Sequence, residues 1–448
     1  MPFEANQEQE ELLQKLGVFL TSRANNRVFL LRGYAGTGKT SVMAALVRAL
    51  QKLQQKTVLL APTGRAAKVL GSYAGTNAYT IHKRIYRQKN MGEMSFSLSY
   101  NAGQDTIFIV DEASMIANDI GENKNFGSGR LLDDLIEYIF SGHNCCMILI
   151  GDNAQLPPVG QPNSPALDKD NLEGYGLHVT MHQLTQVARQ ALESGILRNA
   201  TELRNQLSSG DVNRFPTFIL GGYKDIVRIS SEDMPDEIER SYRETGVAET
   251  IVITRTNKRM NLYNQGIRSR ILWKDEELSG GDRLMVTKNN YYWTRQYEGI
   301  DFLANGDIFE VLRLRNVREL YGYRFADASL RAVDYDWEID VIVWLDTLTS
   351  ESPDASYRLQ QELFSKIAED YPEIQSKKEL VKTIMESPYY NALQVKHAYA
   401  VTCHKAQGGQ WKRVFIDEGN ITEDMLGTGY YRWLYTALTR ATEKIFLI

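Results

Sequence analysis

The chain has 448 residues, a formal net charge of −5 and 43% hydrophobic residues. This length predicts roughly two to four domains with real cores, and the mild negative charge argues against a surface coated in basic patches, although a local basic groove is compatible with it. Three cysteines cannot form a disulfide framework, which favours a reducing, intracellular setting. No apolar stretch approaches ~18 residues and no signal peptide is visible, so we expect no membrane span.

A glycine-rich loop follows the first predicted strand. The apolar run Val28–Leu31 is typical of a buried parallel strand, and Ser41–Leu50 carries apolar residues at helical spacing. Between them, "GYAGTGKT" fits the P-loop pattern at every required position. Its glycines let backbone N–H groups face phosphates, Lys39 would reach the β- and γ-phosphates of ATP, and the Thr40 hydroxyl would bind Mg²⁺. The nucleotide-binding residues predicted here are Gly33, Gly36, Thr37, Gly38, Lys39, Thr40 and Ser41.

Strand-like apolar runs, separated by helical patterns, recur along the chain. They lie at Val28–Leu31, Val58–Ala61, Ile107–Val110, Met147–Ile150, Thr250–Thr254, Val414–Ile416 and Lys444–Ile448. This alternation predicts doubly wound α/β domains. Cys145 and Cys146 open one of the runs, so we interpret them as buried strand residues rather than metal ligands.

Between about Ile271 and Leu393 the rhythm changes to short strands with Gly and Asn turns, which predicts a small inserted β domain. The strongly charged stretch Ser356–Tyr390 is helical in pattern, and helices this polar project into solvent or meet a partner. The acidic stretch Ser230–Glu249 is interpreted as a solvated helix and loop.

Two acidic residues follow the strand Ile107–Val110. In P-loop enzymes the first acid, here Asp111, helps to hold Mg²⁺, and a second acid, here Glu112, is well placed to orient and deprotonate a water. This pair favours hydrolysis over transfer to a hydroxyl, although an exposed Asp-Glu at a strand end is also common. Gln155, in "GDNAQLPPVG", is a neutral group that can sense the γ-phosphate, with an ordinary turn as the alternative.

These residues carry a family resemblance. The sequence resembles the 5′-to-3′ branch of superfamily 1 DNA helicases, the group that includes the phage Dda helicase and RecD. The matching motifs occur in the family's order and are Asn6-x-x-Gln9, the P-loop, "APTGRAAKVL", "TIHK", "DEAS", "GDNAQLPPV", "LTQVARQ", "ITRTNKRMNLYNQGIR", "VTCHKAQGGQ" and "LYTALTRA".

The resemblance implies an α/β fold with two RecA-like P-loop domains, each a parallel sheet flanked by helices, and ATP in the cleft between them. The first would span residues 1–200, with a small pin-like insertion at about 84–104. The second would span residues 201–270 and 394–448. An SH3-like insertion with a charged helical extension would occupy residues 271–393, although its helical part departs from the family pattern.

The resemblance also implies an ATP site. Its catalytic residues would be Lys39, Glu112, Gln155, Arg189 and Arg440, and Gln9, Asp111 and Gly408 would join the P-loop residues in binding nucleotide. Thr40 and Asp111 would hold Mg²⁺. A guanidinium offers planar, bidentate contact to phosphoryl oxygens, and an arginine finger typically contributes roughly 10³–10⁵ to hydrolysis. Surface ion pairs remain the alternative for both arginines.

The residues at the family's DNA contacts are Thr63, Thr80, His82, Asn257, Thr402, His404 and Lys405. Short hydroxyls suit phosphate contacts that do not read sequence, and Lys405 would add salt-dependent attraction. Either histidine could instead be structural. In the pin-like insertion, Phe96 or Tyr100 could stack on the last base pair, and an ordinary hairpin with one buried aromatic is the equal alternative.

The sequence thus predicts an ATP-dependent DNA helicase that moves 5′ to 3′ on single-stranded DNA and unwinds duplex. Alternatives are an ATPase that translocates and remodels protein–DNA complexes, and an ATP-switched clamp. Expected partners are single-stranded DNA, single-strand/duplex junctions, and single-strand-binding or replication proteins, with no membrane. The expected location is the cytoplasm of a bacterial or phage-infected cell, at the nucleoid, in replication, repair or recombination.

Overall fold

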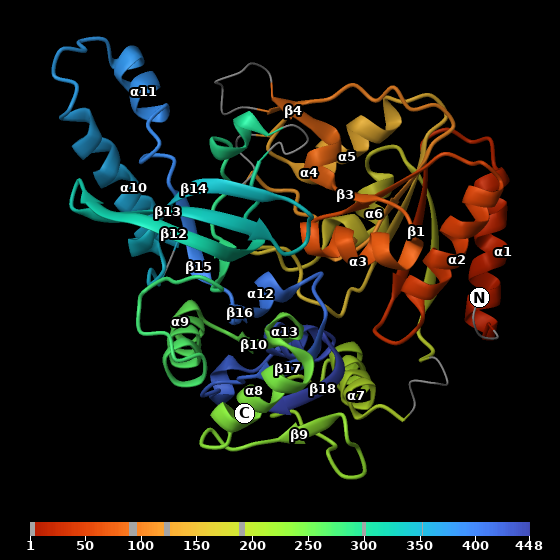
Figure 1. Ribbon diagram of the computed structural model, residues 1–448. Coiled ribbons are helices and arrows are strands. Elements are labelled where there is room, and N and C mark those ends of the chain that lie inside the picture. The colour runs from red at the N-terminus through yellow and green to blue at the C-terminus, as the bar shows by residue number, and fades with distance from the viewer. Residues whose placement is uncertain (1–4, 89–95, 121–125, 188–192, 298–301, 352) are drawn as a thin grey trace. The chain divides into compact units, whose positions relative to one another are not determined.

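The computed structural model describes residues 5–88, 96–120, 126–187, 193–297, 302–351 and 353–448 (Figure 1). The chain divides into two compact units. The first holds residues 1–228 and 406–447, and the second holds residues 229–405 with Ile448. Within the described part of the chain, no helix has the length and apolar character needed to cross a membrane.

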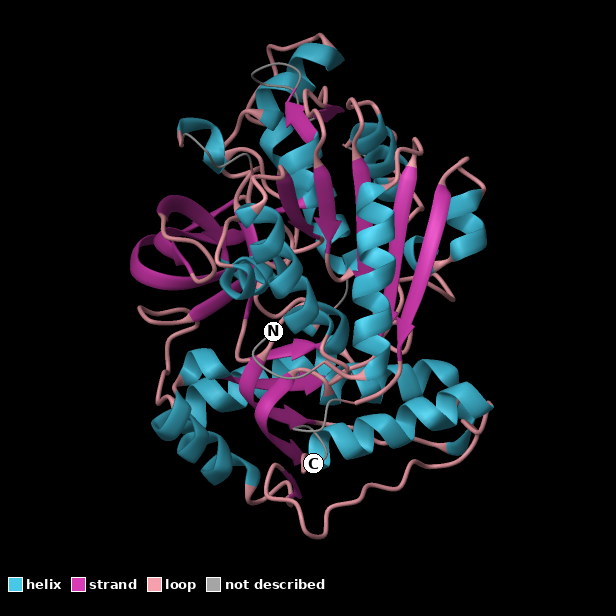
Figure 2. Ribbon diagram, turned by 90° about the vertical axis from the view of Figure 1, so that its right-hand side faces the viewer, coloured by secondary structure: helices cyan, strands magenta, loops and turns pink. Residues whose placement is uncertain are grey.

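A six-stranded, fully parallel sheet forms the centre of the first unit, in the order β3-β2-β6-β7-β1-β8 (Figure 2). Its strands are β1 (Arg27–Gly33), β2 (Thr57–Ala61), β3 (Ala78–Thr80), β6 (Ile107–Val110), β7 (Cys146–Gly151) and β8 (His178–Leu184). Strands β1, β6 and β7 are apolar on both faces, as expected for a parallel sheet covered by helices on both sides. The predicted P-loop α/β fold is confirmed.

Helices cover both faces of this sheet. On one face, α1 (Gln7–Thr21), α2 (Lys39–Lys52) and α3 (Gly64–Ala74) bury their apolar stripes in one core with alternate strand residues, such as Ile148. On the other face, Tyr138 of α5 (Leu131–Phe140) meets Phe108 of β6 edge-on at 6.0 Å between ring centroids. The single-residue alternation of the strands therefore sends side chains into two separate cores.

The strands predicted for the second parallel sheet are divided between the two units. In the first unit, β18 (Ala441–Leu447) pairs in parallel with both β9 (Ile226–Arg228) and β17 (Trp411–Ile416). In the second, β10 (Thr250–Thr254) pairs in parallel with β16 (Ala400–Thr402). The domain boundaries drawn from the sequence stay a prediction.

Shorter elements and the remaining helices connect these strands. In the first unit they are α4 (Ile81–Ile85), β4 (Tyr86–Gln88), β5 (Phe96–Leu98), η1 (Ala113–Met115), η2 (Pro165–Leu167), α6 (Lys169–Glu173), α7 (Gly195–Ser209), η8 (Glu423–Met425) and α13 (Thr428–Leu438). In the second they are α8 (Met234–Thr245), η4 (Val247–Glu249), α9 (Asn257–Gly266), the π-helical η5 (Ile267–Ile271), η6 (Trp293–Gln296) and η7 (Leu345–Thr347). Helix α12 (Cys403–Ala406) lies at the junction of the two units.

A small closed barrel forms the body of the second unit and confirms the predicted β insertion. Its strands are β11 (Arg283–Val286), β12 (Ile308–Leu320), β13 (Tyr323–Ala332), β14 (Glu338–Trp344) and β15 (Leu393–His397). Neighbouring strands are antiparallel except β14 and β15, which are parallel. Alternate residues of all five strands fill the interior, among them Leu284, Val311 and Leu330.

The charged helices pack on this barrel. Leu363 and Ile367 of α10 (Pro353–Ala368) and Ile384 of α11 (Lys377–Met385) are buried in one cluster with Phe325 and Trp344 of the barrel wall. Figure 1 shows both helices beside strands β12 and β13. The sequence predicted that these helices project into solvent or meet a partner. In the structure, their apolar face packs on the barrel of the same chain.

A buried carboxylate ties the barrel to helix α9 and its π-helical extension. Asp282 is fully buried, and it accepts hydrogen bonds from Arg268 at 2.9 Å, Tyr399 at 2.8 Å and the Ser279 N–H at 2.8 Å. Lys274 adds a second cation at 3.0 Å. Burial by itself raises the pKa of Asp282, but these hydrogen bonds outweigh it and lower the pKa to about 2.

We predict that Asp282→Ala destabilises the second unit by ~3–5 kcal/mol, because Arg268 is left buried and uncompensated. Since the folded pKa of about 2 lies below the ordinary 3.8, the carboxylate stabilises the fold above pH ~4, and this contribution is lost as pH falls from ~4 toward ~2. Urea unfolding followed by tryptophan fluorescence, at pH 7 and at pH 3, measures both effects.

The matched control is Asp327→Ala, which breaks a partly exposed pair with Arg318 in the same barrel. Such a pair contributes up to ~1 kcal/mol. Equal losses in the two variants would contradict the structural role assigned to Asp282.

Candidate functional site

The P-loop joins the end of β1 to the start of α2. Gly36 and Gly38 have φ of +75° and +86°, in the left-handed region that favours glycine. At Gly38 a Cβ would also lie 2.6 Å from Nε2 of Gln9, so this position excludes larger residues on steric grounds as well. The loop therefore has the backbone form that a phosphate cradle requires, and it delivers the chain to a helix N-terminus.

Lys39 and Thr37 are held by the loop itself. The Lys39 ammonium donates to the carbonyl oxygens of Gly33 and Tyr34, the latter at 2.9 Å. The Thr37 hydroxyl donates to the same Tyr34 oxygen at 2.8 Å. Thr40 and Ser41 follow in the first turn of α2 and are half-buried. An ammonium, a helix N-terminus and glycine backbone amides form a donor set that fits a polyphosphate.

Gln9 is buried against this loop. Its amide donates to the Thr37 carbonyl oxygen at 3.1 Å, and it completes a capping box with Asn6 at the start of α1. The Asn6-x-x-Gln9 spacing therefore has a local structural cause, and reading of an adenine by Gln9 stays a prediction.

The paired acids lie where β6 ends. Asp111 accepts a hydrogen bond from the Glu112 N–H at 2.8 Å, and burial followed by the charge of Glu112 raises the pKa of Asp111 to about 6. Glu112 has φ of +51°, an uncommon conformation for a residue with a Cβ. Such strain concentrates at functional sites. Both acidic residues are half-buried.

Arg440 lies beside Glu112. The guanidinium is buried and lies 3.7 Å from Oε1 of Glu112. It also donates to the carbonyl oxygen of Thr436 at 3.1 Å and to the Thr439 hydroxyl at 3.1 Å. The structure thus brings together Arg440, the predicted arginine finger, and Glu112, the predicted general base. Arg189 lies outside the described residues, so its placement stays a prediction.

Gln155 is buried next to these groups, and its Oε1 has no hydrogen-bond partner. The backbone that follows it is anchored, because the Leu156 N–H donates to the Thr436 hydroxyl at 2.8 Å and the Leu156 oxygen accepts from Gln407 at 2.7 Å. A fixed backbone with an unsatisfied buried amide is typical of a group that waits for a ligand.

Two functional candidates were missed from the sequence. The hydroxyl of Tyr435 donates to Asp152 at 2.6 Å and accepts from the Ala35 N–H of the P-loop at 2.8 Å. Burial raises the pKa of both groups, and Lys39 opposes the effect at Asp152. Both residues lie in motifs quoted above, "GDNAQLPPV" and "LYTALTRA", so position within a motif was the available signal.

The predicted DNA contacts of the first unit lie at helix starts. The hydroxyl of Thr63 accepts from the Ala66 N–H at 3.2 Å as the cap of α3, and that of Thr80 accepts from the Lys83 N–H at 3.2 Å as the cap of α4. The ring of His82 meets Phe126 edge-on at 4.9 Å. These three residues therefore have structural roles, and their contact with DNA stays a prediction.

The other predicted DNA contacts belong to the second unit. Asn257 begins α9, and Thr402 ends β16. His404 and Lys405 follow in α12 with exposed side chains, and the Lys405 ammonium donates to Oδ1 of Asn305 at 2.6 Å. The exposure of both side chains is compatible with contact to a backbone phosphate.

One predicted placement requires correction. Phe96 is 5% exposed and stacks on Phe126 at 5.0 Å between ring centroids, so its ring faces the core instead of a base pair. Tyr100 is 82% exposed and stays a candidate for strand separation. At Gly408 a Cβ would lie 2.8 Å from that of Ala66, so its small size serves packing against α3, and its contact with nucleotide stays a prediction. Local sequence could not show the burial of Phe96, because it depends on the distant Phe126.

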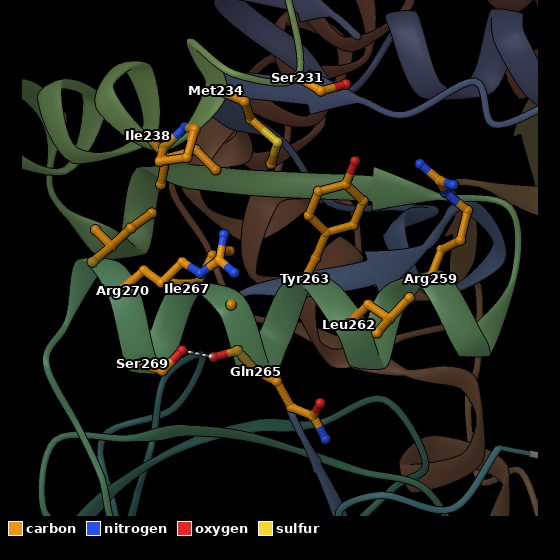
Figure 3. Close-up of a pocket in the computed structure, with 13 residues that line it drawn as sticks. Ser231, Met234, Ile238, Arg259, Leu262, Tyr263, Gln265, Ile267, Ser269 and Arg270 are labelled. Atoms are coloured by element: carbon orange, nitrogen blue, oxygen red, sulfur yellow. Dashed lines mark hydrogen bonds between the residues drawn. The ribbon is translucent and has the colours of Figure 1, made fainter.

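A cavity of about 470 Å³ lies in the second unit between α8, α9 and the π-helical η5. Figure 3 shows Met234, Tyr263 and Arg259 around it, with the Ser269 hydroxyl bonded to the Gln265 carbonyl oxygen on the far side of the helix. None of the predicted site residues lines it. We therefore do not assign this cavity to the nucleotide site, despite its size.

Comparisons with known proteins agree with this geometry. Residues 4–216 match the family model of an AAA domain, and residues 397–448 match the UvrD-like helicase C-terminal domain. The ATP-dependent RecD2 DNA helicase of Deinococcus radiodurans is 24% identical, with 98% of this chain and 48% of its own covered. The ATP-dependent DNA helicase dda of Enterobacteria phage T4 is 24% identical, with 93% of each chain covered.

The chain is thus similar to ATP-dependent DNA helicases along nearly its whole length. It spans about half the length of RecD2 but nearly all of Dda. A crystal structure of the Bacteroides Pif1 helicase with ADP-AlF3 and single-stranded DNA covers 99% of this chain and 92% of its own, at 16% identity and a TM-score of 0.49.

We predict that Tyr435→Phe lowers the free energy of unfolding of the first unit by ~1–3 kcal/mol. The change leaves the Asp152 carboxylate and the Ala35 N–H without their buried partner. Tyr431→Phe, on the same helix, loses one neutral bond to the Arg214 carbonyl oxygen and should cost ~0.5–1.5 kcal/mol. Urea denaturation of both variants measures the difference, and a Tyr431 variant that loses more would contradict the ranking.

Proposed function

We propose that this protein is an ATP-dependent DNA helicase that moves 5′ to 3′ along single-stranded DNA and unwinds duplex. The observation that carries the proposal is the meeting of Arg440 with Glu112 at 3.7 Å, beside a P-loop that is bonded to Tyr435 of the same C-terminal segment. The likeness to RecD2 and Dda, whose names state ATP-dependent DNA helicase activity, supports it.

The substrate ATP binds with its phosphates in the P-loop. Lys39 leaves its two carbonyl partners for the phosphates, because an anion is a stronger partner for an ammonium than a neutral oxygen. Thr40 and Asp111 would hold a Mg²⁺ ion, which would neutralise phosphate charge. Asp111 is suited to this role, since a nearby cation lowers a pKa that burial and Glu112 have raised.

Hydrolysis depends on Glu112, Gln155 and Arg440. Glu112 orients a water and accepts its proton, from a backbone held in the left-handed region. The unpaired Oε1 of Gln155 accepts from the attacking water, and its Nε2 can donate to the γ-phosphate. Arg440 stabilises charge that builds on the phosphoryl oxygens, and Arg189 supplies a second guanidinium.

Gln155 also connects the site to the DNA track. The next residue, Leu156, is bonded to Gln407, which follows the proposed DNA contacts His404 and Lys405 by a few residues in the chain. The phosphate state at Gln155 therefore changes the constraint on this segment, and the energy of ATP enters as a difference in DNA affinity between two states.

The DNA contacts are Thr63, Thr80, His82, Asn257, Thr402, His404 and Lys405, and Tyr100 is the remaining candidate for strand separation. Single-strand-binding or replication proteins are proposed as further partners, and the cytoplasm, at the nucleoid, as the location. An ATPase that translocates and remodels protein–DNA complexes, or an ATP-switched clamp, is the second candidate.

The first test compares unwinding of two duplexes, one with a 5′ and one with a 3′ single-stranded tail. We expect ATP-driven strand separation from the 5′ tail alone, and none with Lys39→Ala, which lacks the phosphate-binding ammonium. Unwinding from the 3′ tail alone would contradict the proposed 5′-to-3′ direction of movement. DNA-stimulated hydrolysis without unwinding would favour the translocase.

A second test separates binding from hydrolysis. We expect Glu112→Gln to retain ATP affinity within ~3-fold while the rate of hydrolysis falls ~10²–10⁴-fold, because the amide cannot accept the water's proton. Fluorescent-nucleotide titration and phosphate release measure the two quantities. A variant that hydrolyses at the normal rate would remove Glu112 from the mechanism.

A further inference from the structure

A polar cavity of about 130 Å³ lies directly beside the hydrolysis residues, on the side of Gln155. It is far larger than the ~10–15 Å³ that one water needs. Its wall comes from the end of β1, the η1 turn, the loop after β7 and helix α13, all in the first unit. Its polar and charged lining residues include Arg32, Ser114, Asp152, Gln155, Asp168 and Arg432.

Two side chains of this wall have buried polar atoms that no protein group satisfies. Ser114 is 1% exposed and Gln155 is 6% exposed, and neither the Ser114 hydroxyl nor Oε1 of Gln155 has a hydrogen-bond partner. Buried polar atoms normally have partners, so two orphans on one cavity wall indicate a polar occupant. The Ser114 hydroxyl can donate to an oxyanion, whereas Oε1 of Gln155 only accepts and therefore suits the P–OH group of hydrogen phosphate or a water.

Two guanidinium groups line the same wall. Arg32 donates to the Leu167 carbonyl oxygen at 2.8 Å, and Arg432 donates to the Pro162 carbonyl oxygen at 2.7 Å and to Asn163 at 3.1 Å. Within the described part of the chain, neither has a carboxylate partner within 4.0 Å. Each therefore keeps N–H donors and an unneutralised charge at the cavity, as a tetrahedral dianion requires.

Two carboxylates also lie on the wall. Asp168 accepts the N–H groups of Asp170 and Asn171 on Oδ1 as the cap of α6. Asp152 accepts from Tyr435 and from the Ala154 N–H at 2.9 Å, and burial raises its pKa. Among the described residues, neither carboxylate forms an ion pair with Arg32 or Arg432.

The order of events in hydrolysis points to the occupant. ADP stays in the P-loop after cleavage, so inorganic phosphate has to leave from the side of the γ-position, where Glu112 and Gln155 lie. Gln155 belongs to both the hydrolysis site and the cavity wall, and Ser114 follows Glu112 by two residues. The cavity is thus the neighbouring space on the exit side.

We propose that this cavity is a phosphate-release site, which takes up inorganic phosphate from the hydrolysis site past Gln155 and holds it on Arg32, Arg432 and Ser114 before it reaches solvent. The inference rests on the proposed ATPase function and deepens it. Hydrolysis itself consumes one water and yields ADP, inorganic phosphate and a proton, and the cavity changes only the exit of phosphate.

The experiment compares Arg432→Gln and Ser114→Ala with the native protein and with Arg48→Gln. Arg48 is an exposed arginine of α2, so this control removes the same charge from the same unit away from the cavity. Rapid-quench measurement gives the rate of ATP cleavage, and a fluorescent phosphate sensor gives the rate of phosphate release, both in the presence of single-stranded DNA.

We expect cleavage within ~2-fold of native in both cavity variants, with phosphate release slowed at least ~5-fold so that a burst of bound phosphate accumulates. Arg48→Gln should show neither change. Equal slowing of cleavage and release, or release at the native rate, would overturn the proposal.

A second measurement does not depend on turnover. In the ADP-loaded protein, inorganic phosphate should raise the thermal midpoint, and Arg432→Gln should weaken this apparent affinity at least ~5-fold, whereas Arg432→Lys restores part of it. Phosphate that stabilises both variants equally would overturn the release site while leaving the ATPase intact. Absence of hydrolysis in the native protein would instead overturn the proposed function.

Discussion

The site depends on one buried hydroxyl. Tyr435 bonds both to the P-loop amide of Ala35, 400 positions away in the sequence, and to Asp152 at the end of β7. A buried donor or acceptor left unpaired costs ~1–3 kcal/mol, so three distant segments have to stay in register. Arg440 follows five residues later, at the end of the same helix. The hydrogen bonds of Tyr435 therefore help to fix the position of Arg440 beside Glu112.

Charge balance is the second constraint. Burial raises the pKa of Asp111 and Asp152, and Lys39 lowers both. A single ammonium therefore helps to keep two buried carboxylates ionised, while Arg440 acts on Asp111 and Glu112. Arrival of a polyphosphate draws both cations toward new anions, and the carboxylates then require another cation. The donor set thus explains why nucleotide and Mg²⁺ would bind together.

The parts of the site that depend on local sequence were predictable. The P-loop, the strand β6 and the acids after it need only a glycine pattern, an apolar run and a chain reversal, all of which nearby residues encode. Family motifs also pointed to Arg440, whose partner Glu112 is 328 positions away, a pairing that periodicity cannot reveal.

The features that the sequence did not predict depend on long-range packing. Phe96 has the alternation of an exposed hairpin residue, but the distant Phe126 covers it. The charged helices use a narrow apolar stripe to pack on the barrel. Asp152 and Tyr435 were overlooked because a buried hydroxyl–carboxylate bond leaves no periodic signal in sequence.

Gln155 shows how the fold reserves a side chain for chemistry. Thr436 and Gln407 satisfy the backbone of Leu156 beside it, whereas its own Oε1 is buried and has no partner among the described residues. A polar atom left in this state lowers stability, so its position is best explained by a ligand that completes it. In the proposed mechanism, the side chain that borders the polar cavity is also the one that contacts the attacking water, so phosphate that leaves through the cavity would change the partner of Gln155. Under that proposal, hydrolysis, phosphate release and the change in DNA affinity would follow in a fixed order.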